Sequence, residues 1–134
     1  MQYVVDASIA SEYLLKTPLG RKVAPILEHA YLIAPSLLDV EVMSVLGRAV
    51  RLKKISEERA TLAIDDLKNW PLRRISHRRL LSTAWKYRNN LSAYDSFYVA
   101  VAKIYDSILI RSDVPLSRAP IGDVVVQNVT IKTV

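Results

Sequence analysis

Apolar runs of strand length alternate with longer amphipathic stretches along this 134-residue chain. The apolar runs cover residues 2–5, 31–34, 72–76 and 107–111, and an alternating stretch at 124–132 predicts one more strand. Between them, the spacing of apolar positions predicts helices over residues 7–15, 20–29, 36–52, 56–70, 77–88 and 92–105. Strands separated by helices need crossover connections, so the pattern predicts an α/β fold with a mainly parallel, helix-covered sheet.

Two of these helices begin with capping signals. Ser36 and Asp39 have the spacing of a capping box, which predicts that both side chains serve the start of the helix over 36–52. Ser56, followed by two glutamates, predicts the start of the next helix. That helix is expected to end at Trp70, because a proline follows it.

The composition fits one globular domain over residues 1–134, with 51% hydrophobic and 24% charged residues. The longest stretch without Asp, Glu, Lys or Arg is 29–38, far below the roughly 18 residues of a membrane span. We therefore expect a soluble, cytoplasmic protein without a membrane segment. The chain has no cysteine and two histidines, so a bound metal would be held by oxygen ligands.

The positive charge is concentrated in one segment. The net charge is +6, and no acidic residue occurs between residues 67 and 94. From charge alone, a phosphate-binding face and an ordinary solvated helix face remain equally open. Among the aromatic residues of this segment, Trp70, Trp85 or Tyr87 is a candidate for stacking on unpaired bases, although at least one is expected in the core. The candidate RNA-binding residues are Lys68, Arg73, Arg74, Arg78, Arg79, Lys86 and Arg88.

Four acidic residues occupy positions that local rules do not fully explain. Asp6 and Asp113 each follow a predicted strand, at the edge where open α/β sheets bind ligands. Glu41 lies on an apolar helix face, and Asp95 lies in a helix that is apolar nearly all round. Each has an ordinary alternative as well: a helix cap for Asp6, a capping box with Ser92 for Asp95 and a turn for Asp113.

Together, these four acids predict an internal carboxylate cluster. Such a cluster repels itself unless a cation is bound, and Mg²⁺ prefers oxygen ligands. Ser8 and Ser112 each stand near an acid, where they would orient a carboxylate or bind a metal-bound water, or simply form a turn. Asp39 points about 200° away from Glu41 around its helix and is expected outside the cluster.

Four segments resemble, in order and spacing, the motifs of PIN-domain ribonucleases, in particular the VapC toxins of VapBC toxin–antitoxin pairs: VVDAS, PSLLDVEVMSVL, AYDSFYVAVA and LIRSDVPL. The resemblance implies a three-layer α/β/α PIN-like fold with a mainly parallel central sheet. It also implies a Mg²⁺- or Mn²⁺-dependent endoribonuclease that acts on RNA, forms a homodimer and is inhibited by a cognate VapB-type antitoxin.

The resemblance places Asp6, Glu41, Asp95 and Asp113 on the family's acidic positions, which are catalytic and bind the metal. Ser44 stands where many members have Asn, and Ser112 where many have Thr. Both replacements keep a polar group, so Ser8, Ser44 and Ser112 are expected to support the carboxylates.

The reaction that these residues predict is metal-assisted hydrolysis of RNA phosphodiester bonds, without a side-chain nucleophile. One alternative is a non-catalytic nucleic-acid-binding or regulatory PIN-like module with a degenerate site, although all four acids are retained. Another is a phosphoacceptor domain of receiver type. That class needs an acidic pair after the first strand, where this chain has Asp6 followed by Ala7.

Overall fold

The structure, a computed structural model, describes residues 1–112 and 125–129. Each described element lies within a few residues of a predicted one, which confirms the predicted alternation of strands and helices. The elements follow in the order β1 (Gln2–Val5), α1 (Ala7–Leu14), α2 (Pro18–Glu28), β2 (Tyr31–Pro35), α3 (Leu37–Arg51), α4 (Glu57–Asn69), β3 (Arg73–Ile75), α5 (His77–Trp85), α6 (Ala93–Ile104), β4 (Ile108–Ser112) and β5 (Val126–Val129).

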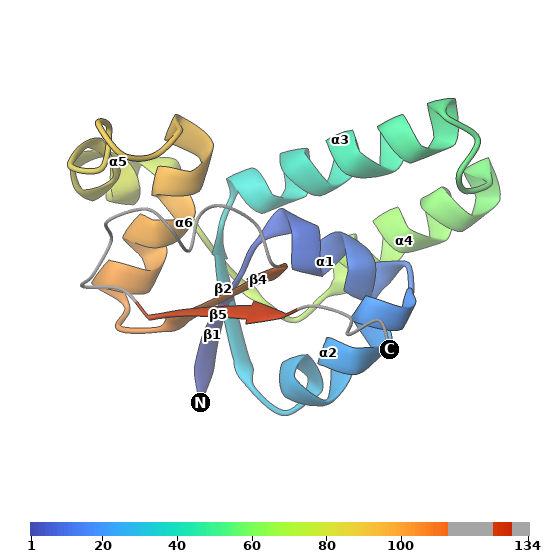
Figure 1. The fold of residues 1–134 in the computed structure, drawn as a ribbon, viewed down its shortest axis with the longest axis horizontal. Helices are drawn as coiled ribbons and strands as arrows, with labels where there is room; N and C mark the ends of the chain where they lie inside the picture. The colour runs from blue at the N-terminus through green and yellow to red at the C-terminus, as the bar shows by residue number, and fades with distance from the viewer. Residues whose placement is uncertain (113–124, 130–134) are drawn as a thin grey trace.

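The strands form one sheet in the order β3-β2-β1-β4-β5. All four strand pairs are parallel, as crossover connections through helices require. Helix α6 packs against β1, β2 and β4, and α5 packs beside α6. Figure 1 shows α5 and α6 on one side of the sheet and α1 to α4 on the other. The expected three-layer α/β/α arrangement with a parallel sheet is confirmed.

The two central strands are buried on both faces. Val4 and Val5 of β1 and Leu109 and Ile110 of β4 are fully inaccessible to solvent, as expected for a parallel sheet covered by helices. Because parallel strands end at the same edge, the residues that follow β1 and those that end β4 come together there.

Helices α1 and α2 approach each other closely at Gly20. A Cβ atom added to Gly20 would lie 1.9 Å from the Glu12 carbonyl oxygen. Thr17 begins α2 by accepting a hydrogen bond from Gly20 N at 3.1 Å, and its hydroxyl also donates to the Glu12 carboxylate. Only a residue without a side chain fits at position 20.

The predicted capping box at α3 is wrong, although the helix itself is present. Ser36 has helical backbone angles and makes no side-chain cap bond; its hydroxyl donates instead to Ile75 O of β3 at 3.2 Å. By contrast, Ser56 caps α4 as predicted, by accepting from Arg59 N at 3.1 Å. A contact with a distant strand thus replaces the local cap of α3.

Helix α5 ends at Trp85, three residues before the predicted end. Lys86 N, Tyr87 N and Arg88 N donate to carbonyls three residues earlier, so the chain continues in tight turns of 3₁₀ type rather than as an α-helix. In the described ranges, no helix has the length and apolarity to cross a membrane.

Candidate active site

A cavity of about 500 Å³ opens at the carboxyl edge of the sheet, where α1, α3, α6 and β4 meet. We call it the acid cavity. Three of the four predicted acids line it, whereas Asp113 lies outside the described residues. Its lining residues are Asp6, Ala7, Ser8, Val40, Glu41, Ser44, Val45, Tyr94, Asp95, Tyr98 and Arg111.

Asp6 is held rigidly between β1 and α1. Its Oδ1 accepts hydrogen bonds from Ile9 N at 3.0 Å and from the Ser8 hydroxyl at 2.7 Å. Asp6 therefore caps α1, as one of the two interpretations of the sequence predicted, and it also lines the acid cavity. Burial raises the pKa of the Asp6 carboxyl, and the Asp95 carboxylate adds to this rise. The two hydrogen bonds and the Arg111 guanidinium oppose it.

The serines expected to support the carboxylates fall into two groups. Ser112 Oγ donates to Ser8 Oγ at 2.9 Å, and Ser8 Oγ donates to Asp6 Oδ1 at 2.7 Å. This chain of hydroxyls links the end of β4 to the Asp6 carboxylate and fixes its orientation. Ser44 lines the cavity from α3 and is exposed to solvent.

Two acids on α3 differ in their surroundings although only one residue stands between them. Asp39 pairs outside the cavity with Arg74, whose Nε donates to both carboxylate oxygens at 3.0 and 2.8 Å. Glu41 turns into the cavity, and its Oε1 is buried without a hydrogen-bond partner. Burial raises the pKa of Glu41, the neighbouring Tyr98 hydroxyl opposes this rise, and the carboxylates of Asp6 and Asp95 add to it.

Asp95 enters the cavity from the first turn of α6. Ser92 begins this helix by accepting a hydrogen bond from Asp95 N at 3.1 Å. One turn further on, Tyr98 is 3% exposed. Its pKa is raised by burial and then by the neighbouring Glu41 carboxylate, yet its hydroxyl has no hydrogen bond of normal geometry. The expected helix buried nearly all round is present from Ser96 to Ala102.

The carboxylates of Asp6, Glu41 and Asp95 all line the acid cavity, but they do not form a cluster around a single point. Within residues 1–112 and 125–129, no three His, Cys, Asp or Glu side chains stand close enough to hold one metal ion. Like charges repel in a buried site, and the raised pKa values of Asp6 and Glu41 reflect this repulsion together with burial. The expected convergence of the four acids on one or two shared ions stays a prediction, because Asp113 lies outside the described residues and the other three do not form such a ligand set by themselves.

Arg111 is a residue of the cavity that the sequence did not single out. It is 7% exposed, and its Nε lies 3.7 Å from Asp6 Oδ2. The register of the sheet explains the placement, because Val5 pairs with Ile110 and the next residues on the two strands are Asp6 and Arg111. An arginine inside an otherwise apolar strand run, one step before Ser112, was the signal available in the sequence.

The predicted RNA-binding residues are not equivalent. Arg78, Arg79 and Lys86 are exposed on and just after α5. Arg74 is paired with Asp39 and also donates to Leu67 O at 2.7 Å, which ties β3 to α3 and α4. Its charge is already neutralised, so we remove Arg74 from the proposed RNA-binding set.

The remaining predicted RNA-binding residues come from α4, from β3 and from the segment after α5. Arg73, on β3, places its guanidinium 5.2 Å from the centroid of the Tyr105 ring. Lys68 is exposed in the last turn of α4. Arg88 follows α5, and its guanidinium lies 4.8 Å from the centroid of the Trp85 ring.

Of the three candidate stacking residues, one is available to a ligand. Trp85 is 66% exposed. Trp70 is partly buried and stacks on Tyr13 with a centroid distance of 5.2 Å, and Tyr87 packs partly buried against the core. The expectation that at least one of them belongs to the core is confirmed.

Comparison with known proteins matches residues 3–121 to the PIN domain family. The chain is 43% identical over 88 residues to ribonuclease VapC1 of Mycobacterium tuberculosis, a match that covers 65% of this chain and 66% of VapC1, just under two thirds of its length. It is 33% identical over 119 residues to ribonuclease VapC3 of the same species, covering 88% of this chain and 87% of that protein.

Solved structures share the fold at low sequence identity. The chain matches VapBC2 from Rickettsia felis, crystallised bound to a DNA fragment from their promoter, with a TM-score of 0.69 and 14% identity over 96% of this chain and 98% of that one. It matches FitAcB from Neisseria gonorrhoeae with a TM-score of 0.55 and 21% identity, covering 94% and 96% of the two chains.

Proposed function

Because this chain belongs to the PIN domain family and to its VapC type, we propose that it is a metal-dependent endoribonuclease. In this proposal it hydrolyses RNA phosphodiester bonds and is inhibited by a cognate antitoxin. The observation that carries the proposal is the acid cavity, where carboxylates from β1, α3 and α6 face one space at the carboxyl edge of a parallel sheet.

The donor chemistry of the acid cavity suits a divalent ion, although the described carboxylates would have to move closer together to share one. The donors are carboxylate oxygens, the ligands that Mg²⁺ and Mn²⁺ prefer, and Glu41 Oε1 is buried without a partner. Asp6, Glu41 and Asp95 would hold the ion, with Asp113 as a fourth candidate. When bound, the ion supplies Lewis acidity, which makes a water more acidic and stabilises negative charge on phosphate oxygens.

Side chains around the acid cavity orient the carboxylates that would bind the ion. The hydroxyls of Ser8 and Ser112 fix the direction of the Asp6 carboxylate, so Asp6 loses little side-chain entropy when it binds a ligand. Val40, Val45 and Tyr94 line the same space with exposed side chains. We propose that Ser44, which lines the cavity, binds a water or a phosphate oxygen there.

We propose that RNA approaches across α5, which packs against α6. The exposed charges of Arg78, Arg79 and Lys86 would contact phosphates without choosing a sequence. The exposed Trp85 ring, with the Arg88 guanidinium over it, would stack on an unpaired base. Lys68 and Arg73 would extend this surface toward β3.

Partners enter the proposal through the relatives. One structural neighbour contains VapB together with VapC, so we propose a VapB-type antitoxin as the inhibitor of this chain. We also propose a homodimer, a single domain over residues 1–134 and a cytoplasmic location, where RNA is accessible.

The test of the proposed activity compares two carboxylates on one helix. Total cellular RNA is incubated with wild type, Glu41→Gln or Asp39→Asn in Mg²⁺, in Mn²⁺ and in chelator, and new RNA ends are mapped by sequencing. We expect wild type and Asp39→Asn to cleave in metal only, and Glu41→Gln not to cleave. If wild type binds RNA but produces no new ends in either metal, the chain is a non-catalytic nucleic-acid-binding module instead.

The proposed RNA surface is tested separately, by salt dependence. Replacing Arg78 and Arg79 with Glu should weaken RNA binding for all sequences alike. Each lost phosphate contact should lower the slope of log K against log salt by about 0.7 on single strands. An unchanged slope would mean that these arginines form only a solvated helix face.

A further inference from the structure

Arg111 is a buried cation with at least one N–H group that no described residue satisfies. Its Nε is buried and has no hydrogen-bond partner among the described residues. The nearest acidic oxygen, Asp6 Oδ2, is 3.7 Å away, beyond the 2.7–3.2 Å of a normal N–H···O bond. Leaving a buried charged donor unsatisfied costs more than leaving a neutral one, so the geometry needs an explanation.

The surroundings of Asp6 prevent its carboxylate from moving closer to accept a hydrogen bond from Arg111 Nε. The other oxygen of Asp6 is fixed by Ile9 N and by the Ser8 hydroxyl, which Ser112 holds in turn. Arg111 itself comes from β4, whose backbone is paired with β1. Asp6 caps α1 directly after β1 and Arg111 lies on β4, so both side chains start from backbone that is fixed by neighbouring elements. The Arg111 side chain lines the acid cavity.

The chemistry of the cavity points to the missing partner. Apart from Arg111, its charged groups are the carboxylates of Asp6, Glu41 and Asp95, which repel a phosphodiester. A guanidinium is always charged, and its N–H groups match the anionic oxygens of a phosphate. Within the described lining, Arg111 is the group able to attract one.

We propose that Arg111 binds a non-bridging oxygen of the RNA phosphodiester that enters the acid cavity. This contact does not require the divalent ion, so it contributes to RNA binding in chelator as well. The inference rests on the proposed function and assigns to it a phosphate-binding residue. The opposing possibility is that Arg111 serves only as the counter-ion of Asp6.

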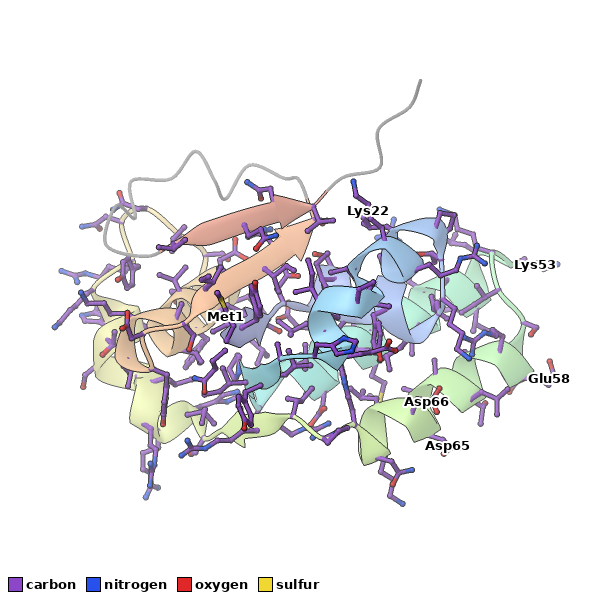
Figure 2. The ribbon with its side chains drawn as sticks, turned by 90° about the horizontal axis from the view of Figure 1, so that it is seen from below. Met1, Lys22, Lys53, Glu58, Asp65 and Asp66 are labelled. Carbon is purple, nitrogen blue, oxygen red and sulfur yellow. The ribbon has the colours of Figure 1, made fainter. Side chains whose placement is uncertain are left out.

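The experiment measures binding of a fluorescent single-stranded RNA by anisotropy in chelator, where cleavage is suppressed. Arg111→Met should weaken binding on the order of tenfold, because a charge-assisted hydrogen bond is lost, and should lower the salt slope by about 0.7. The control is Lys53→Met, which removes one positive charge from the turn between α3 and α4 (Figure 2). It should change binding little.

A second pair of variants separates the two roles of Arg111 and avoids a buried unpaired acid. Asp6→Asn is compared with the double variant Asp6→Asn with Arg111→Gln, in which neither partner is charged. A phosphate-binding Arg111 predicts that the double variant binds RNA on the order of tenfold more weakly than Asp6→Asn alone. Equal binding by the two would overturn the inference, since a counter-ion has no role once Asp6 is neutral.

The outcomes also distinguish this inference from the proposed function. If wild type cleaves RNA in Mg²⁺ while both Arg111 comparisons show unchanged binding, only the inference is wrong. If wild type neither binds nor cleaves RNA, the proposed function is wrong and the inference falls with it.

Discussion

The acid cavity and a second pocket between α1, α2 and α4 are similar in size, about 500 and about 430 Å³, but differ in how their polar groups are satisfied. We call the second one the α1–α2 pocket. There Tyr13 stacks on Trp70, and its hydroxyl donates to Glu28 Oε2 at 3.1 Å. The two aromatic rings and Glu28 of that pocket thus find partners within the protein.

In the acid cavity several buried polar groups lack a hydrogen bond of normal geometry, although Glu41 and Tyr98 lie beside each other and influence each other's pKa. Five buried side-chain atoms of the described residues lack a hydrogen bond, and three of them belong to this cavity: Glu41 Oε1, Tyr98 Oη and Arg111 Nε. None lies among the described lining residues of the α1–α2 pocket. Since buried polar groups are normally satisfied, unpaired groups identify a ligand site better than volume does.

The strongest test of this contrast is Asp95→Asn. We expect RNA cleavage to fall to the level seen in chelator, while the metal-free protein becomes equally or more stable, because one of three repelling carboxylates is neutralised. Mg²⁺ at about 100 times its dissociation constant should stabilise wild type by roughly 2.7 kcal/mol and the variant by less. Melting temperatures of both proteins in chelator and in Mg²⁺ measure this.

The opposite result has a clear meaning. If Asp95 only supports the start of α6, the Asn variant should lose on the order of 1 kcal/mol in chelator, and Mg²⁺ should shift neither protein. The acid cavity would then resemble the α1–α2 pocket, with its carboxylates serving the fold.

For the α1–α2 pocket, the corresponding change is Gly20→Ala. A Cβ atom would meet the Glu12 carbonyl at 1.9 Å, so α1 and α2 must separate, and we expect a loss of about 3 kcal/mol. The matched control is Gly47→Ala, where the Cβ would meet only the flexible Arg51 side chain at 3.3 Å; it should gain about 0.5–1 kcal/mol. Denaturant unfolding distinguishes the two, and the folded fraction of Gly20→Ala should cleave RNA normally.

The same contrast explains what could be predicted from the sequence. Strands and helices follow from local apolar spacing and caps such as Ser56, so they were predicted to within a few residues. The separation of Asp39 from Glu41 followed from helix geometry alone. The cap at Ser36 was wrong because its hydroxyl binds Ile75 O, 39 residues away, and no local pattern carries that contact.

Charged residues in the sheet were harder to predict. Arg74 and Arg111 both lie on strands, but the sequence does not give the partner of either. Asp39 neutralises Arg74, whereas Arg111 is placed in the acid cavity by the register of β4 with β1. Strand order and register depend on the whole sheet, so local sequence does not distinguish a paired arginine such as Arg74 from one that lines a cavity such as Arg111.

A smaller effect is expected from the pH dependence of stability in chelator. Burial raises the pKa of Glu41 above its ordinary value of 4.5, so the folded state binds a proton more tightly than the unfolded state. Stability should therefore fall as the pH rises above 4.5 and through the raised pKa of Glu41, because the folded state must then bury a charge. Glu41→Gln should flatten this fall, as measured by urea unfolding.

Saturating Mg²⁺ should reverse the trend for wild type, because protons compete with the ion for the carboxylates. A wild-type protein whose stability in chelator rises over this range would show that the carboxylates of the acid cavity are satisfied by the protein itself.

The smallest expected effect concerns the α1–α2 pocket. The strain at this pocket is in the backbone of Lys16 and not in unsatisfied polar groups. Lys16 lines this pocket and ends α1 with a positive φ of 56°. Its N–H donates to Tyr13 O, and Thr17 N donates to Glu12 O, the two bonds of a Schellman motif, which favours glycine at this position. An L-residue in the left-handed region costs roughly 1–2 kcal/mol of stability. Replacing it with glycine removes this cost, but part of the gain is lost because glycine has a higher conformational entropy in the unfolded state.

Lys16→Gly should therefore stabilise the protein by about 0.5–1 kcal/mol, which raises the melting temperature by about 2–4 °C. Lys16→Ala is the control, since it removes the same side chain but keeps the Cβ atom and hence the strain; it should gain little. RNA cleavage should not change in either variant, because neither touches the acid cavity. If Lys16→Gly were to reduce cleavage while raising stability, the α1–α2 pocket would have to be coupled to the acid cavity through α1, whose first residues line one and whose last residues line the other.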